Sequence, residues 1–439
     1  MKQINVAILG CGTVGTGVAR LLTQNADIIK ARIGCDLSLM YVADIDTTTD
    51  RGITFEPGVI ISETTRAIAD PRVDIVVETI GGEGIAKKLI LDAMASGKHV
   101  VTANKALLAK HGNAIIAAAS EHGVDLAYEA SVGGCMPIIK TIRESLVGNR
   151  ITAMTGILNG TCNYILTKIT DEGVDFETAL AQAQAKGYAE ADPTLDVEGQ
   201  DAAHKLALLS ALAFGMNINF DGVFIEGITQ ITPLDIEFAA QFGYRIKLLA
   251  ITKYNGKTVE ARVHPTMIPF DNMLSNVNGT LNAIDVCADA VDNILLYGHG
   301  AGMMPTASAV IADIADIARN LISNGAGRLP VMGFQTAEIR SIPIMPMEDL
   351  VTHYYFRFDA LDRPGVLAAI SGILGKHAIS IKSVQQKGRK TDGSVPVVML
   401  THLAREADVI QALDEIRALD VVAGKPMLIR IEDDDGQEP

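Results

Sequence analysis

The sequence predicts an α/β protein in three parts: a doubly wound parallel-sheet domain, an α+β domain and a C-terminal βαββαβ unit. Over residues 1–130, short apolar runs alternate with alanine-rich helical patterns, which is typical of a doubly wound sheet. A pattern that is apolar almost all round predicts a buried helix over 200–214. Strand and helix patterns then recur in the order βαββαβ over residues 351–431.

Composition excludes several classes of protein. The 439 residues carry a formal net charge of -15, which opposes binding to a phosphate backbone, so we expect no nucleic-acid partner. The five cysteines are widely spaced, which predicts reduced thiols and a cytoplasmic location. The apolar run that begins at Ile4 is too short for a signal peptide. No later run is long enough to cross a membrane, so we expect no membrane partner.

The first apolar run, Ile4 to Leu9, reads as a buried parallel strand that ends at a glycine turn, before a helical stretch from Val18. Gly10 permits a tight turn, Gly12 allows close approach of a pyrophosphate, and Gly15 lets the helix pack against the strand. Thr13 and Val14, between Gly12 and Gly15, lie at the helix N-terminus, which stabilises the negative charge of a bound phosphate. This order of strand, turn and helix predicts a dinucleotide-binding site.

The second strand, Leu37 to Val42, is followed by Asp44. An acid at this place binds the adenosine ribose hydroxyls of NAD and repels the extra phosphate of NADP. Asp46 is an alternative for this role, and Asp44 could also be an ordinary turn residue.

The strand pattern from His99 to Thr102 leads directly to Lys105. Ligands bind at the carboxyl ends of strands in open α/β sheets, and a lysine at a helix N-terminus has the wrong charge for the helix dipole, so we expect Lys105 to be functional. The loops over 129–137 and 157–166 could line the same cleft. Cys135, with no histidine nearby in the sequence, is expected to be structural.

The predicted helix over 200–214 carries Lys205 and, four positions earlier, Asp201. This spacing puts both side chains on one face. An exposed salt bridge is the ordinary interpretation of such a pair, but charged residues are seldom buried without a partner or a task. We therefore expect the acidic stretch 187–205 to be a reaction site.

These motifs closely resemble the homoserine dehydrogenase family over nearly the whole chain. The family signature is met at Ala183, Gly187, Asp192, Pro193, Asp196, Gly199, Asp201 and Lys205. The segments 12–15, 102–105, 159–166 and 298–307 match as well. The length excludes a fused aspartate kinase, so the chain resembles the monofunctional form.

The resemblance implies reversible, nicotinamide-dependent interconversion of L-homoserine and L-aspartate 4-semialdehyde, on the route to threonine, isoleucine and methionine. Lys205 would donate and accept the proton, which agrees with the lowered pKa expected of a buried lysine. In family terms, Lys105 contacts substrate or cofactor and shares the proton transfer, and Glu190 binds the substrate's amino group. Asp196 and Asp201 would complete the polar pocket.

Cofactor contacts and a cation loop also follow from the resemblance. The expected cofactor-binding residues are Gly10, Gly12, Thr13, Val14, Gly15, Asp44, Thr102, Lys105 and Gly302. Many relatives carry an arginine where this chain has Ala43, so NAD is favoured over NADP, although Arg51 could compensate. A Na⁺ or K⁺ site would map to Glu129, Val132, Gly134 and Met136. Cys135 and Met136 depart from the family's commoner glycine and isoleucine there, but most ligands would be backbone carbonyls. A glycine-rich turn without an ion is the alternative.

The predicted domain organisation has six parts. Residues 1–130 form a nucleotide-binding Rossmann domain, 131–302 a substrate, catalytic and dimerisation domain, and 303–325 a segment that returns to the first domain. Residues 326–350 form a linker, 351–431 a ferredoxin-like unit that resembles an ACT domain, and 432–439 a solvated acidic tail. ACT domains pair edge to edge and bind amino acids, so L-threonine is the expected effector, unless the unit only supports assembly. A homodimer or homotetramer is expected.

Two other functions remain open at this point. The chain could be another Rossmann-type semialdehyde dehydrogenase, which would use Cys135 as a nucleophile. It could also be a non-catalytic, amino-acid-responsive binding protein whose first domain only senses a dinucleotide. The lysine and the acids around Lys205 favour an alcohol dehydrogenase that acts on homoserine over these two alternatives.

Overall fold

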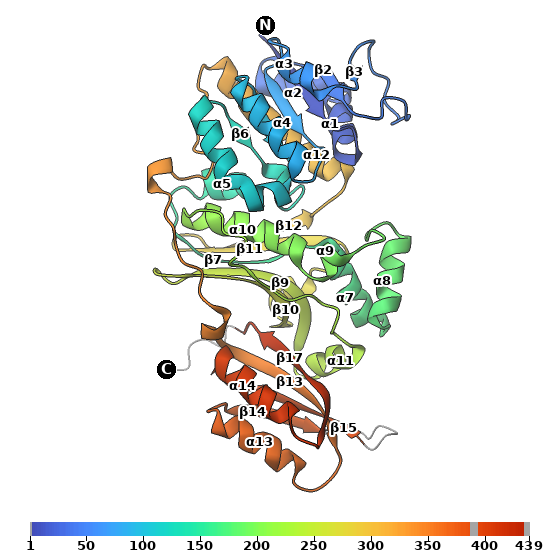
Figure 1. The fold of residues 1–439 in the computed structure, drawn as a ribbon, viewed down its shortest axis with the longest axis vertical. Helices are drawn as coiled ribbons and strands as arrows, with labels where there is room; N and C mark the ends of the chain where they lie inside the picture. The colour runs from blue at the N-terminus through green and yellow to red at the C-terminus, as the bar shows by residue number, and fades with distance from the viewer. Residues whose placement is uncertain (1, 387–393, 434–439) are drawn as a thin grey trace.

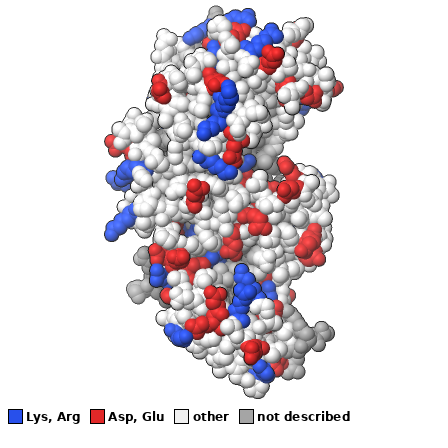
Figure 2. All heavy atoms as spheres, in the orientation of Figure 1, with Lys and Arg blue, Asp and Glu red and all other residues white. Residues whose placement is uncertain are grey.

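The computed structural model describes residues 2–386 and 394–433 and confirms the predicted α/β class. Figure 1 shows the N-terminal domain, the middle of the chain and the C-terminal unit stacked in this order along the long axis. On the face drawn in Figure 2, acidic and basic side chains are interspersed. In the described part of the chain, no helix is both long enough and apolar enough to cross a membrane. All five cysteines are unpaired, as predicted.

Within the described residues, the N-terminal domain contains a six-stranded parallel sheet in the order β3-β2-β1-β4-β5-β6. Its strands are β1 (Gln3–Leu9), β2 (Asp36–Ala43), β3 (Ile60–Ile61), β4 (Ile75–Glu78), β5 (His99–Thr102) and β6 (Leu126–Ala127). The order reverses direction at β1 and β4, which is the place where ligands bind in doubly wound sheets.

Helices cover both faces of this sheet. They are α1 (Thr13–Gln24), α2 (Ala26–Ile33), α3 (Thr64–Ala69), α4 (Gly84–Ala95), α5 (Lys105–His122) and α12 (Met303–Ile322). One core joins α1, α2 and α12 to the sheet, so the helix that follows Gly302 packs against the N-terminal domain. Helix α1 begins at Thr13, earlier than the predicted Val18. Gly15 and Gly17 hide its start, because glycine gives no apolar period where the helix packs against neighbouring backbone.

The middle of the chain supplies a mostly antiparallel sheet and the helices that cover it. Its strands are β7 (Ile151–Ile157), β8 (Phe224–Ile225), β9 (Tyr244–Tyr254), β10 (Val259–Pro269), β11 (Leu281–Ala288) and β12 (Asp292–His299). The helices are α6 (Ile138–Lys140), α7 (Gly160–Glu172), α8 (Phe176–Ala185), α9 (Thr194–Val197), α10 (Gln200–Phe214) and α11 (Pro233–Gln241). Short helical turns lie at η1 (Glu129–Ser131), η2 (Thr141–Ser145) and η3 (Met273–Asn276).

The C-terminal unit has the predicted βαββαβ order. Its elements are β13 (Val351–Leu361), α13 (Val366–Lys376), β14 (Ile381–Gln386), β15 (Ser394–Thr401), β16 (Ala404–Arg405), α14 (Glu406–Arg417) and β17 (Val422–Ile431). Strand β14 begins at Ile381, and Gly365, with a φ of 91°, immediately precedes α13.

The sequence suggested a separate C-terminal unit. In the structure this unit is joined to the middle of the chain, because its sheet continues the middle sheet. Strand β17 pairs with β10 in parallel, at Thr266 with Arg430 and at Met267 with Ile431. In the described chain this gives an 11-stranded sheet whose main path is β12-β11-β7-β9-β10-β17-β13-β15-β14.

The segments expected to be a linker and a solvated tail are also attached. The linker, which includes η4 (Thr336–Glu338) and η5 (Met347–Asp349), runs along the middle of the chain, where Arg340 N donates to Gly215 O at 2.9 Å. Glu432 is largely buried and forms ion pairs with Arg262 and Lys253, so the prediction of a solvated tail was wrong at its first residue. Residues 434–439 of that tail lie outside the described residues.

Candidate active site

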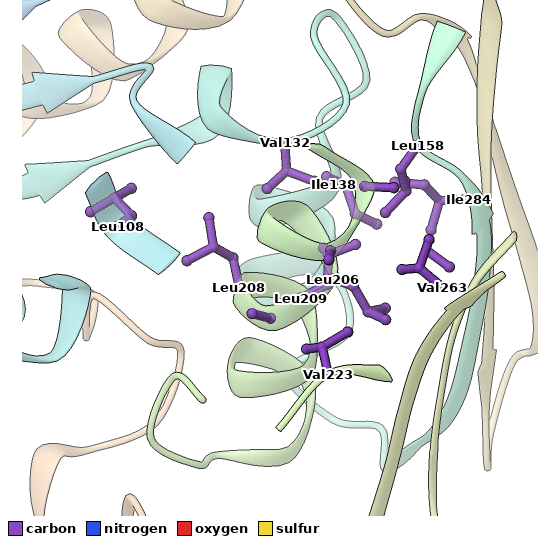
Figure 3. Close-up of a cluster of buried hydrophobic side chains, with 14 of the residues drawn as sticks. Leu108, Val132, Ile138, Leu158, Leu206, Leu208, Leu209, Val223, Val263 and Ile284 are labelled. Atoms are coloured by element: carbon purple, nitrogen blue, oxygen red, sulfur yellow. The ribbon is translucent and has the colours of Figure 1, made fainter. Parts of the chain in front are cut away.

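Helix α10 positions the central acid and lysine of the site. It runs from Gln200 to Phe214, as predicted, and begins after Gly199, which has a φ of 83°. Residues 202–214 are all buried. Figure 3 shows Leu206, Leu208 and Leu209 of this helix within a cluster of buried apolar side chains. Because these surroundings cannot solvate a charge, a lysine here needs a partner from the protein.

Lys205 and Asp201 form an ion pair along one face of α10. Lys205 is 7% exposed, and its Nζ lies 2.6 Å from Asp201 Oδ2. The same ammonium donates to the carbonyl oxygen of Leu158 at 2.6 Å. Burial lowers the pKa of Lys205, the positive charge of Lys105 adds to this effect, and Asp201 offsets it only in part. The shift is in the direction that the sequence predicted.

Lys105 reaches the same carboxylate from the N-terminal domain. It is the first residue of α5, after Asn104, whose side chain caps the helix by accepting from Leu107 N. Lys105 Nζ lies 3.2 Å from Asp201 Oδ1. The negative charge of Asp201 raises the pKa of Lys105, which is 38% exposed. One carboxylate is therefore shared by two lysines from two domains.

Asn159 holds the acids in place and was not assigned a role from the sequence. Its Nδ2 donates to Asp196 Oδ1 at 2.7 Å and to Asp201 Oδ2 at 2.8 Å, while its Oδ1 caps α7 by accepting from Cys162 N. Its position directly before a helix could have predicted the helix cap. The bonds to the two acids could not be predicted in this way, because they depend on contacts between distant segments.

Two further acids of the stretch 187–205, which we call the strip, differ in exposure. Asp196 lies in α9, and burial raises its pKa, with the bond from Asn159 opposing the shift. Glu190 is exposed, and its side chain lines the same cavity as Asp196 and Asp201. A carboxylate in this position can accept hydrogen bonds from a cationic group on a small ligand.

The glycine turn has the geometry expected of a dinucleotide site. Gly10 has a φ of 97°, and a Cβ on Gly15 would lie 2.0 Å from Gly10 O, so neither position accepts a side chain. A Cβ on Gly12 would meet nothing within 4 Å, which leaves open space beside the N-terminus of α1. The N–H groups in the first turn of a helix have no partner within that helix, so this end of α1 suits a pyrophosphate.

Two of the predicted cofactor residues are engaged with the protein. Asp44 accepts from Cys11 N at 2.5 Å and from Asp46 N at 2.9 Å, and Arg51 Nη2 lies 3.7 Å from its carboxylate. Thr102 is fully buried, and its hydroxyl donates to Glu78 Oε2 at 2.6 Å. The side chain of Thr102 is therefore engaged within the protein at the buried end of β5.

A cavity of about 750 Å³ joins the two domains at this point. The predicted residues that line it are Thr13, Val14, Lys105, Gly134, Glu190, Asp196, Asp201, Lys205 and Gly302. The residues that do not line it are Gly10, Gly12, Gly15, Asp44, Thr102, Glu129, Val132 and Met136. Cys135 is exposed but also lies outside this lining, so the lysines rather than the cysteine face the cavity.

The proposed cation loop is compact but its carboxylate is occupied. Both oxygens of Glu129 accept from backbone N–H groups, those of Ile139 and Lys140, at 2.9 Å each. Burial, together with nearby Asp313, raises the pKa of Glu129 to about 7. Gly134 has a φ of 57°, and a Cβ there would lie 2.5 Å from His299 O, so glycine is required for the close approach of the two loops.

Backbone oxygens are the free ligands of that loop. Among the residues that the structure describes, no backbone or side-chain donor bonds the carbonyl oxygens of Val132 and Gly134, whereas Met136 O accepts from Ile138 N. Carbonyl oxygens suit a hard monovalent cation, so this part of the predicted ligand set fits such an ion.

Comparisons with known proteins agree over the whole chain. Family models match for the homoserine dehydrogenase NAD-binding domain at residues 10–129, for homoserine dehydrogenase at 137–315 and for the ACT domain at 354–421. A homoserine dehydrogenase from Neisseria gonorrhoeae is 44% identical over 98% of this chain and 99% of its own length. One from Pseudomonas aeruginosa is 45% identical, also over 98% of this chain and 99% of its own length.

A solved structure agrees with both the sequence and the fold. The crystal structure of a homoserine dehydrogenase from Thiobacillus denitrificans is 46% identical, covers 99% of each chain and superposes with a TM-score of 0.93. The family models, the relatives and the fold agree, and the chain belongs to the homoserine dehydrogenase family.

Proposed function

We propose that this oxidoreductase interconverts L-homoserine and L-aspartate 4-semialdehyde at the cavity between the two domains. The single observation that carries the proposal is Asp201, which binds a buried lysine from α10 and a second lysine from α5 in the lining of one cavity. The nicotinamide cofactor, beside the turn Gly10 to Gly15, supplies the hydride acceptor or donor when it is bound. All other steps fall to the protein.

Lys205 moves the proton. When homoserine is oxidised, the neutral amine of Lys205 accepts the hydroxyl proton, and when the semialdehyde is reduced, the ammonium returns it to the oxygen. The lowered pKa of Lys205 makes both forms accessible. Asp201 stays ionised, because the two lysines hold its pKa below the usual value although burial opposes them. It orients both ammonium groups and leaves Lys105 to contact the substrate oxygen or the cofactor.

The acids select the substrate. Glu190 binds the ammonium of homoserine, because it is an exposed carboxylate in the lining of the cavity and a charge-assisted bond suits that group. Asp196 and Asp201 complete the polar wall, with Asn159 between them. The pathway role in threonine, isoleucine and methionine synthesis follows from this reaction.

For the cofactor, we infer a preference for NAD over NADP. Ala43 leaves no cation directly before Asp44, and the carboxylate of Asp44 repels a 2′-phosphate. Arg51 opposes this inference, because it lies beside Asp44, but its three nitrogen atoms already donate to Cys11 O, Thr49 O and Asp46 O. Homoserine oxidation measured with each cofactor tests the inference, and an equal or higher kcat/KM with NADP would reject it.

For the cation, we infer that Na⁺ or K⁺ binds the carbonyl oxygens of the loop over 132–136, next to Glu129. The free oxygens of Val132 and Gly134 support this site. Activity that is lost in buffers with an organic cation alone, and restored by K⁺ or Na⁺, is the expected result.

The C-terminal unit is proposed to bind L-threonine as a feedback inhibitor. A cavity of about 390 Å³ lies beside the turn from Asp362 to Leu367 and supports an amino-acid site. The domain boundaries given above and a homodimer or homotetramer are part of the same proposal. Edge strand β12, where Tyr297 is 56% exposed, is one surface that supports pairing of subunits.

One assay tests the reaction, the cofactor preference and the threonine effect together. It measures steady-state oxidation of homoserine with NAD, with NADP and with added threonine. Absence of homoserine-dependent NADH or NADPH formation would favour the non-catalytic binding protein. The variant Cys135→Ser should retain activity, because Cys135 lies outside the cavity lining. Loss of activity in this variant, together with dependence on phosphate, would favour the semialdehyde dehydrogenase that acts through a thioester.

A further inference from the structure

Strand β9 contains a lysine that the reaction does not use. Lys247 is 1% exposed, and its Nζ donates to Val277 O at 2.6 Å, to Asn278 Oδ1 at 3.0 Å and to Asn163 Oδ1 at 3.1 Å. An ammonium has three N–H donors, so each is satisfied. Among the described residues, no carboxylate lies within ion-pair distance of this nitrogen.

A buried cation without a counter-charge costs free energy of folding, because its desolvation is not offset by an ion pair. Burial lowers the pKa of Lys247 to about 7, which shows how poorly the surroundings solvate the charge. A methionine would fill the same space without that cost. The presence of a lysine at this position must therefore be explained by the segments that its three hydrogen bonds connect.

The acceptors belong to a loop and a helix that form one wall of the active-site cavity. Asn163, in the first turn of α7, also donates to Val277 O and to Leu281 O, at 3.0 Å each. A Cβ on Gly160 would lie 2.6 Å from Thr280 O, so the loop presses directly on the start of α7. The cavity lining from this wall is Asn159, Gly160, Thr161, Thr280 and Asn282.

The same wall sets the position of the acids. Asn159 caps α7, four residues before Asn163, and it donates to both Asp196 and Asp201. A shift of the loop over 277–281 would move the first turn of α7 and with it this amide. The path from Lys247 to the substrate acids thus consists of hydrogen bonds and one short helical turn.

We propose that Lys247 is a positioning residue for the homoserine site, whose ammonium fixes the loop over 277–281 on α7 and so orients Asn159 toward Asp196 and Asp201. This inference rests on the proposed function and names a residue that the reaction itself does not touch. It accounts for the Asn163 of the segment 159–166, to which the mechanism gives no role.

The test compares Lys247→Met with Lys98→Met. Lys98 is also buried, and it donates to the carbonyl oxygens of Asp70 and Val73 in the N-terminal domain, far from the cavity lining. Lys247→Met should raise the homoserine KM about tenfold, since small displacements at a site are costly, and leave the cofactor KM within about twofold. Lys98→Met should leave both constants within about twofold.

Calorimetric titration with homoserine separates the two hypotheses. If the wild type binds homoserine but does not oxidise it, the proposed function fails, while a weaker affinity of Lys247→Met still supports the positioning role. If Lys247→Met does not fold, Asn278→Ala removes one of its acceptors and should raise the homoserine KM or Kd about threefold. Unchanged homoserine constants in the folded variant, equal losses for homoserine and cofactor, or a wild type that does not bind homoserine would overturn the inference.

Discussion

Two of the regions that bury charged side chains do so in different ways. The first is the active-site strip on α9 and α10. The second is the joint where the C-terminal unit meets the middle of the chain, defined here by β10, β13, β17 and the acids that face them. At the joint, Arg430 is 3% exposed and binds Glu406 and Glu226, and Arg357 binds the fully buried Asp235. Of these carboxylates, Glu406 and Asp235 are buried, whereas the side chain of Glu226 is 41% exposed.

The electrostatic outcome is opposite in the two regions. Burial alone would lower the pKa of Arg430, but Glu406 and Glu226 outweigh it and raise the pKa. In the strip, burial prevails, so the pKa of Lys205 is lowered although Asp201 lies at 2.6 Å. Lys105 competes for the same carboxylate. The comparison indicates that a buried pair has a structural role when each charge is satisfied, and a chemical role when a shared partner leaves one proton easy to remove.

The sharpest test of this distinction removes one lysine from each region. Lys205→Met should lower kcat by about 10²–10⁴-fold, the usual contribution of general acid–base catalysis, with a much smaller change in the homoserine KM. The matched control is Lys253→Met at the joint, where Lys253 Nζ also lies 2.6 Å from a carboxylate, that of Glu432. It should leave kcat within about twofold. Equal turnover of Lys205→Met and wild type would refute the role of Lys205.

The reverse expectation applies to the joint. Arg430→Met leaves Glu406 buried without its partner and should lower the free energy of unfolding by about 3–5 kcal/mol, as measured by urea denaturation, while kcat stays near the wild-type value. The control is Arg405→Met, whose ion pair with Asp349 is half exposed on both sides. That pair should contribute about 0–1 kcal/mol. Similar destabilisation by both variants would remove the distinction between the joint and the surface.

Substrate binding gives the third and smaller effect. Glu190→Gln keeps the shape of the side chain but removes the charge that faces the ammonium of homoserine. A charge-assisted hydrogen bond contributes about 1.5–3 kcal/mol, so the homoserine KM should rise roughly ten- to hundredfold. Glu177→Gln, on the exposed surface of α8, should leave the KM unchanged. An unaltered KM for Glu190→Gln would remove this residue from the binding site.

The strip was predictable because its main contacts are local. Asp201 and Lys205 stand four positions apart on a helix whose apolar surroundings were visible in the sequence, and the glycine turn has its own local geometry. The expectation that Lys105 meets them drew on a rule for parallel sheets and on the family resemblance. The bonds from Asn159 to Asp196 and Asp201 could not be predicted, because they join segments whose approach no local pattern encodes.

The joint was missed for the same physical reason. Strand β17 has an ordinary strand pattern, and nothing in that pattern tells which edge it pairs with. Its parallel contact with β10 joins Thr266 to Arg430 across a long stretch of chain. Glu432 was read as part of a solvated tail because the acids that follow it suggested so, whereas Arg262 and Lys253 draw it inside. The charge of a segment does not reveal the partners that tertiary packing brings to it.

The smallest expected effect concerns the pH dependence of the strip. Oxidation of homoserine needs the neutral amine of Lys205, so its rate should rise with pH through the pKa of this residue, and reduction of the semialdehyde should fall over the same range. Asp201 raises the pKa of Lys205 and Lys105 lowers it. Asp201→Asn should therefore move the inflection to lower pH, and Lys105→Met should move it to higher pH.

These shifts can be read from profiles of kcat normalised to each variant's own maximum, so a loss of overall activity does not hide them. Both variants remove one charge from the same cluster, and only the sign of that charge differs. Shifts in the same direction would mean that altered packing, rather than charge, sets the pKa of Lys205. Opposite shifts would identify the shared carboxylate as the feature that separates the strip from the joint. At the joint, a cation such as Arg430 has carboxylates of its own, and no neighbouring lysine among the residues that the structure describes competes for them. Removal of a lysine therefore could not raise its pKa.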